Sequence, residues 1–122
     1  PTTSKPTFRN YFPASLSPGD AIAFVADDPD QMFVAQQDSD GSNLVAADLN
    51  LNANLVFGAG STTTGMSGVE IDSSTGATTA THQVRLIAFY DTPSNDATAN
   101  NSNLVIKINN HSLGSHTGTV GV

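Results

Sequence analysis

Short apolar runs, each bounded by turn-forming residues, recur along most of this chain. The first, residues 21–26 (AIAFVA), lies between Gly19-Asp20 and the acidic stretch 27–30, as expected for a buried strand between two turns. Residues 31–37 (QMFVAQQ) have the length and composition of a returning strand. The pattern therefore predicts that these two strands pair as a β-hairpin.

Further strand candidates follow at residues 43–47, 53–57, 69–72, 78–90 and 103–109. Between them, turns or polar loops are predicted at residues 38–43, 73–76 and 91–103. The longest candidate, 78–90, alternates imperfectly, which indicates that part of it is covered on both faces. In the last one, apolar side chains alternate with Val105 and Lys107, so Lys107 should face water. The glycine-rich tail is either a second arm or a last edge strand. About seven or eight short strands predict an all-β fold, a small β-sandwich or barrel.

Residues 1–19 differ from the rest, because they hold four of the six prolines together with several aromatic side chains. Proline removes a backbone donor and fixes φ, so this segment should form an extended arm rather than a paired interior strand. Residues 20–122 then form a single β domain. The aromatic side chains either tuck into that domain or cross to a neighbouring subunit, and the sequence leaves both readings open. The candidate contact residues on the arm are Phe8, Arg9, Tyr11 and Phe12.

The composition favours strands over helices. Ser and Thr together number 27 and Asn and Asp 21, whereas the chain has one Glu, two Lys, two Arg and two Met. Ser, Thr, Asn and Asp side chains compete for nearby backbone groups and so disfavour helix interiors, while Thr suits a pleated surface. A length of 122 residues fits one domain with one core.

The charge and the cysteine count exclude several classes of partner and site. The formal net charge is -7, which opposes binding to phosphate backbones or anionic lipid, so neither nucleic acid nor a membrane is an expected partner. No cysteine is present, which rules out disulfides and thiolate zinc sites. No apolar run is long enough to span a membrane, and the first ten residues lack the apolar region of a signal peptide. We expect a protein made in the cytoplasm.

One glycine-rich segment, residues 60–67 (GSTTTGMS), has the spacing of a phosphate-binding loop. Met66 stands where such a loop needs its lysine, and the following VEIDSSTG is not a helix. Nucleotide binding is therefore not expected. The glycines of this segment should instead serve the backbone of a loop that leads into the strand at 69–72.

Other polar groups also have ordinary structural interpretations. Asp38, Asp40 and Asn43 resemble part of a calcium loop, but Leu49 occupies the twelfth position, where a glutamate is needed. An Asx-rich turn is the better interpretation, with incidental calcium binding as the alternative. Glu70 and Asp72, two residues apart on a strand, should share a face as an acid/base pair would, but they more often represent surface charge.

The three histidines and the serines are the remaining candidates for metal binding and catalysis. His82, inside a strand, should make an ordinary hydrogen bond, and His111 and His116 have no evident third metal ligand. No G-x-S-x-G motif marks a hydrolase nucleophile. We therefore assign no catalytic, cofactor-binding or metal-binding residue and expect a protein that is not an enzyme and needs no cofactor.

Two longer segments carry a resemblance to a known family. AADLNLNANLVFGAGSTTTGMSGVEIDSSTGATTATHQVRLIAFYDTPSND and the later NLVIKINNHSLG resemble the capsid decoration or cement proteins of tailed bacteriophages, with GSTTTGMSG, IDSSTG and KINNH the most specific pieces. The similarity covers roughly residues 20–122. It implies an all-β homotrimer that sits at capsomer junctions on the virion surface, binds the major capsid protein and strengthens the shell.

Two function hypotheses follow. The first is a capsid cement protein whose arm residues Phe8, Arg9, Tyr11 and Phe12 bind the partner, because aromatic residues and Arg dominate interface energetics. The alternative is a carbohydrate- or receptor-binding β module of a virion fibre or secreted protein. Exposed aromatic platforms would mark that alternative, yet the chain has no Trp and two Tyr.

Overall fold

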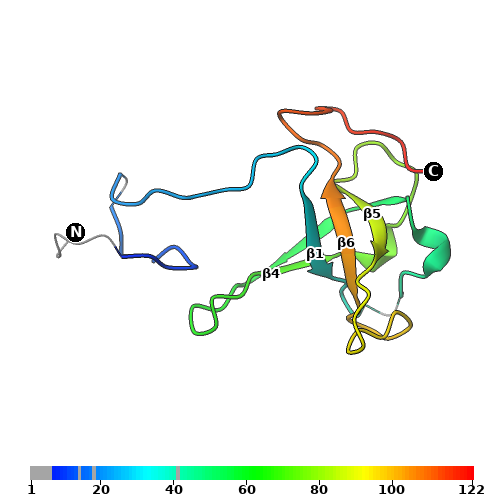
Figure 1. Cartoon of the computed structure of the whole chain (residues 1–122), viewed down its shortest axis with the longest axis horizontal. Helices are drawn as coiled ribbons and strands as arrows, with labels where there is room; N and C mark the ends of the chain where they lie inside the picture. The colour runs from blue at the N-terminus through cyan, green and yellow to red at the C-terminus, as the bar shows by residue number, and fades with distance from the viewer. Residues whose placement is uncertain (1–6, 14, 18, 41) are drawn as a thin grey trace.

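The structure, a computed structural model, describes residues 7–13, 15–17, 19–40 and 42–122. Its centre is an antiparallel pair, β5 (Val84–Phe89) and β6 (Asn103–Ile108). Strand β1 (Met32–Gln36) lies on the outer side of β6, and β2 (Asn52–Ala53) lies on the outer side of β5. The resulting four-stranded sheet has the order β1-β6-β5-β2 and is antiparallel throughout. Figure 1 shows this sheet with the N-terminal segment leading away from it.

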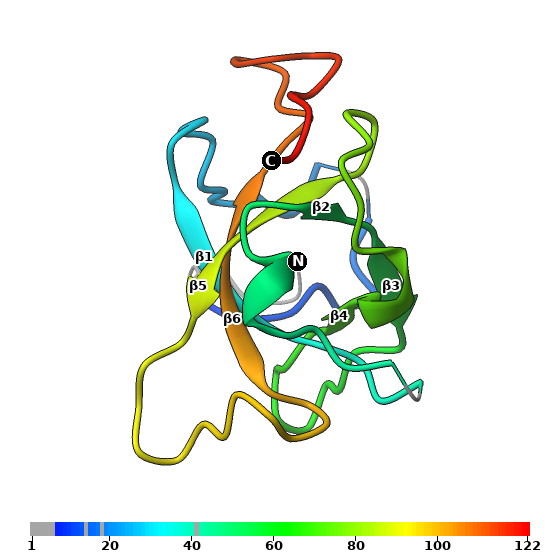
Figure 2. The ribbon, with the colours of Figure 1, turned by 90° about the vertical axis from the view of Figure 1, so that its right-hand side faces the viewer.

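A second sheet is formed by β3 (Leu55–Gly58) and β4 (Gly68–Ile71), which are also antiparallel. Only Asn54 separates β2 from β3, and Gln37, directly after β1, makes a parallel bridge to Ile71 at the end of β4. The two sheets are therefore joined on both sides. In Figure 2 the strands lie around one centre, as in a small barrel. The prediction of a small all-β fold is confirmed.

Alternation along the strands builds the core. In β6, Leu104 and Ile106 are buried, and in β5 the buried positions are Val84 and Leu86. Their burial stabilises the fold by about 1.5–3 kcal/mol for each large side chain. A bulge between Leu86 and Ala88 shifts the register of β5 against β6. The remaining core side chains come from the loops and the smaller strands: Leu44, Ala53 and Ile71.

The side chain of a buried glutamine joins the end of β1 to two loops. Gln37 is fully buried, and its side-chain amide donates to Ser102 Oγ at 2.9 Å and to the Ala99 carbonyl oxygen at 3.2 Å. Its side-chain oxygen accepts from the Leu44 backbone N–H at 2.9 Å. Each polar atom of this side chain thus has a partner, which is the condition for burying an amide without a large penalty.

The strand predicted at residues 21–26 is wrong, and so is the hairpin. These residues have no strand structure, and Ile22, Phe24 and Val25 are exposed. Strand β1 forms as predicted, but its partner is β6, far along the chain. The alternation of a short apolar run does not say which strand it pairs with. Here the distant pairing across residues 32–36 and 103–107 occurs in place of the local one.

Three other predicted elements differ. Residues 43–47 are not a strand, and Ala46–Asp48 form a short 3-10 helix in which Asp48 accepts a hydrogen bond from the Val45 N–H. The predicted strand 78–90 begins only at Val84, since residues 78–83 form turns. The predicted turn at 73–76 contains a second 3-10 helix, Ser73–Thr75. The described part of the chain therefore has six strands, fewer than expected.

The C-terminal tail is neither a free arm nor an edge strand. It folds back over the domain, where the Gly121 N–H donates to the Thr78 carbonyl and the Val122 N–H to the Asn50 carbonyl. Gly118 makes this path possible. Its φ is +74°, and a Cβ there would lie 1.9 Å from the Ala80 carbonyl oxygen. Only glycine fits both the left-handed backbone and the close approach. Across the described residues we find no helix long and apolar enough to cross a membrane.

Candidate functional site

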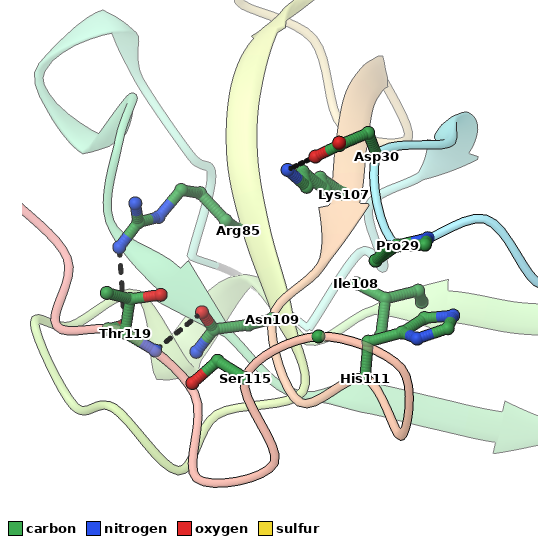
Figure 3. A pocket seen from close by; sticks show the side chains of 10 residues that line it. Pro29, Asp30, Arg85, Lys107, Ile108, Asn109, His111, Ser115 and Thr119 are labelled. Atoms are coloured by element: carbon green, nitrogen blue, oxygen red, sulfur yellow. Dashed lines mark hydrogen bonds and ion pairs between the residues drawn. The ribbon is translucent and has the colours of Figure 1, made fainter.

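A hollow of about 290 Å³ lies where β5, β6 and the tail meet (Figure 3). Most of the residues that line it have polar side chains, and they come from segments far apart in the sequence. The residues around it are Pro29, Asp30, Arg85, Lys107, Ile108, Asn109, His111, Gly114, Ser115 and Thr119. Two of the four basic side chains of this acidic protein are among them.

Arg85 and Lys107 are directly opposite each other on β5 and β6. Like charges in that position repel, so each needs its own compensation. Arg85 turns toward the tail: its Nε donates to Asn52 Oδ1 at 3.3 Å, and Nη2 donates to the carbonyl oxygens of Thr119, at 3.2 Å, and Val120. The guanidinium therefore holds the tail in place.

Lys107 is compensated by an ion pair. Its Nζ lies 2.5 Å from Asp30 Oδ1, and the side chain is partly exposed. The hydrogen bond from Lys107, and then its positive charge, lower the pKa of Asp30 below its ordinary value of 3.8. The pair joins the base of the N-terminal segment to β6. Lys107 was predicted to face water, and it does so in part, with Asp30 as its partner.

Two buried asparagines complete the network. Asn109 donates to the carbonyl oxygens of Ala80, at 2.8 Å, and His82, at 3.0 Å, and its Oδ1 accepts from the Thr119 N–H at 3.0 Å. Asn52 donates to the carbonyl oxygens of Thr79 and Thr119. These side chains hold the 78–83 turns and the tail on the sheet. Sequence reasoning missed both, and the only signal was an amide next to an apolar strand.

The hollow offers little chemistry. His111 Nδ1 accepts from the Leu113 N–H at 3.0 Å, and Ser115 Oγ donates to the Gly118 carbonyl at 3.0 Å. Both groups thus stabilise the tail loop, and among the described residues no hydrogen bond joins a serine hydroxyl to a histidine ring, as a nucleophile and its base would require. The arrangement is that of a polar joint between the tail and the sheet.

A cluster of acidic side chains lies where β4 ends. Ligand oxygens of Asp38, Asp40 and Asp72 lie within 4.8 Å of one another. Asp38 Oδ1 accepts from both the N–H and the Oγ of Ser73, and Asp72 Oδ1 accepts from the N–H and Oγ of Ser74. These bonds cap the 3-10 helix that follows β4. Such oxygens are the type that a hard cation takes. Within the Asx-rich segment itself, Asp40 Oδ1 accepts from the Ser42 N–H at 3.2 Å, as expected of an Asx turn.

The remaining predicted groups are dispersed. Asn43 Nδ2 donates to the Thr98 carbonyl oxygen at 3.5 Å, and its Oδ1 is buried with no hydrogen-bond partner among the described residues. Glu70 is half-buried on β4, whereas Asp72 follows the strand and caps the next turn, so the two do not act as a pair. His82 Nδ1 lies 3.3 Å from the Asn52 carbonyl oxygen, as expected of an ordinary hydrogen bond.

The glycine-rich segment is the loop of the β3–β4 hairpin. Gly58 and Gly68 face each other across the two strands, and a Cβ on Gly58 would lie 2.7 Å from the Gly68 carbonyl oxygen. Within the loop, the Ser61 N–H donates to the Met66 carbonyl at 3.0 Å. The backbone role predicted for these glycines is therefore observed. Asn10 and Tyr11 of the N-terminal arm lie against this loop, around a second hollow of about 310 Å³.

The four predicted contact residues lie on the arm. Phe8 and Phe12 are 86% and 68% exposed, and Arg9 is exposed as well. Tyr11 is half-buried, and its hydroxyl accepts a hydrogen bond from Arg9 Nη1 at 2.8 Å. The Arg9 guanidinium also lies 5.6 Å from the centre of the Tyr11 ring, within cation–π range. The structure thus leaves two phenylalanines free and orders the pair between them.

Comparisons of the chain with protein-family models, with curated proteins and with solved structures find no match.

Proposed function

We propose that this protein is a non-enzymatic decoration (cement) protein of a tailed-bacteriophage capsid. It binds the major capsid protein on the outside of the head and stabilises contacts between capsid subunits, as a homotrimer on the virion surface. The observation that carries the proposal is the N-terminal arm, which leads away from the β domain and presents Phe8 and Phe12 to solvent (Figure 1). The sequence resemblance of the β domain to such proteins points the same way.

Exposed aromatic side chains on an extended arm suit docking to another protein. A phenylalanine buries about 150–250 Å² when a partner covers it, and a few such anchors supply most of the affinity of an interface. Arg9 and Tyr11, already bonded to each other, lie between the two phenylalanines. A pair that is ordered before binding loses less side-chain entropy when it docks.

The β domain suits a structural rather than a catalytic role. The cations of the hollow between β5, β6 and the tail are used internally, Arg85 to hold the tail and Lys107 to hold Asp30. A domain stabilised by its own contacts changes shape little on binding, which limits the free-energy cost of assembly. A cement protein needs this property, because it must connect neighbouring capsid subunits without changing its own conformation.

The test is binding to empty heads assembled from the major capsid protein of the encoding phage. The chain should co-sediment with the heads, and Phe8→Ala combined with Phe12→Ala should weaken binding at least tenfold, or about 1.4 kcal/mol. Leu113→Ala is the matched control, since Leu113 is also an exposed apolar residue but lies on the tail. Failure of the unaltered chain to bind the heads would contradict the function, and equal binding by the double variant would contradict the role of the arm.

A further inference from the structure

Strand β1 is apolar on both faces, and its core-facing side is covered only in part, at Ala35. Met32, Phe33 and Val34 are consecutive, so they point alternately to the two sides of the sheet, and all three are exposed. A continuous apolar run is typical of a strand that is buried on both faces. β1 is also the first strand of its sheet, and apart from the bridge at Gln37 its outer edge has no partner strand among the described residues. The strand therefore lacks a neighbouring strand on its outer edge, opposite β6.

A second uncovered segment directly precedes it. Residues 21–26 are extended and make no backbone hydrogen bond within the described part of the chain. Phe24 is 86% exposed and Ile22 84%. Exposed backbone donors and acceptors combined with large apolar side chains are the properties of a strand that adds to a sheet edge.

The turn between them keeps this segment away from its own β1. The Gln31 N–H donates to the Asp28 carbonyl at 3.1 Å, and the Asp30 N–H donates to Asp28 Oδ1 at 2.8 Å. Asp30 is in turn held to β6 by Lys107. Pro29 restricts Asp28 to an extended backbone, so the chain leads outward at this point, as Figure 1 shows. Residues 21–26 and β1 are therefore adjacent in the sequence but are not paired with each other.

We propose that residues 21–26 of one copy of this protein add as a β-strand to the free edge of β1 in a second copy. The six-residue segment matches the five residues of β1 in length, and both are apolar. Each copy donates one segment and offers one edge, so a closed assembly satisfies every segment. The exchange replaces the intramolecular hairpin by the same contacts between copies.

Charge permits a second copy as the occupant only where the contact between the copies is uncharged. With a net charge of -7, most surfaces of two copies repel each other. Residues 21–26 and 31–37 carry no charged side chain, so this contact between two acidic chains brings no like charges together at its centre. The inference does not depend on the capsid role, because it concerns contacts between copies of the chain alone.

Engineered cysteines test the pairing, and the chain has no cysteine of its own to interfere. Phe24→Cys is purified separately from Met32→Cys, Val34→Cys and Gln36→Cys, and the reduced proteins are mixed in pairs and oxidised. At least one pair should give a disulfide-linked dimer at tenfold or higher yield than Phe24→Cys with Leu113→Cys, and the best pair reports the register. Yields equal to that control in every pair would overturn the proposal.

A double variant separates exchange from closure within one chain. Phe24→Cys combined with the best-reacting β1 cysteine should give linked multimers at micromolar concentration. A monomer with an internal disulfide would overturn the proposal in favour of the closed hairpin.

The solution mass gives an independent readout. The unaltered chain should be oligomeric, Phe24→Asp should lower its mass to that of a monomer, and Phe12→Asp should leave it oligomeric. Phe24 is outside the core, so circular dichroism should show an unchanged β domain for both variants. A monomeric unaltered chain, or an unchanged mass for Phe24→Asp, would overturn the proposal whatever the outcome of the head-binding test.

Discussion

The tail and the N-terminal segment are both irregular, yet they differ in how their polar and apolar groups are satisfied. The tail is held to the sheet by Arg85, Asn109 and Asn52, each of which binds backbone carbonyls or N–H groups in it. Residues 21–26 bind nothing within the described chain, and their apolar side chains are exposed. One end of the chain completes the fold, while the other is available to a partner.

This difference shows where stability and function divide. Groups that a single copy satisfies internally lie on the β domain, and their loss should unfold it. The exposed apolar side chains of residues 21–26 lie on the N-terminal segment, and on the proposed assembly their loss should affect association but not folding. Substitutions matched in chemistry but placed in the two regions test the division.

The largest effect is expected at Gln37. Gln37→Ala removes three hydrogen bonds and leaves the buried Leu44 N–H without an acceptor, so the free energy of unfolding should fall by about 3–5 kcal/mol. Denaturant unfolding measures the change. Gln36→Ala is the control. Gln36 is exposed, so this substitution should change the free energy of unfolding by less than about 0.5 kcal/mol. Similar losses for the two variants would show that the buried hydrogen bonds of Gln37 do not stabilise the fold.

A smaller effect is expected at Gly118. Gly118→Ala forces a left-handed backbone onto alanine and brings its Cβ against the Ala80 carbonyl, so we expect a loss of at least about 2 kcal/mol in thermal unfolding experiments. Gly19 also has a positive φ, +93°, but a Cβ there would contact nothing within 4 Å. Gly19→Ala should leave the unfolding temperature unchanged, since it strains only the N-terminal segment. A drop for Gly19→Ala as large as that for Gly118→Ala would remove the distinction between the two ends.

Sequence reasoning succeeded where the pattern itself records burial. The alternation in β6 identified Leu104 and Ile106 as core positions, and the glycines around the β3–β4 loop were correctly assigned to the backbone. It failed for residues 21–26, since their pattern is the same whether a strand is covered by its own domain or by another chain. Nor could it find Asn52 and Asn109, because their partners are backbone groups brought close only by the fold.

The smallest effect is expected from the ion pair at the base of the N-terminal segment. The pKa of Asp30 is lowered by Lys107, so the pair stabilises the fold at pH values above 3.8 and this contribution is lost as the pH falls through the lowered pKa. Asp30→Asn should therefore be less stable than the unaltered chain near pH 7, and the difference should shrink in acid. The unfolding midpoint of each protein, measured as a function of pH, gives this difference. Asp27→Asn is the control, because it removes the same charge from a residue outside the ion pair. A stability difference between Asp30→Asn and the unaltered chain that grows as the pH falls would contradict this role of the ion pair.

Hydrogen exchange in the free and the head-bound protein tests the central claim most directly. In the free chain, amides of β5 and β6 should exchange slowly, because they are paired across 84–89 and 103–108, while those of arm residues 7–12 should exchange fast. On binding to empty heads, protection should rise in the arm and stay unchanged in β5 and β6. Protection gained on the β domain alone, with the arm still exchanging fast, would contradict the account.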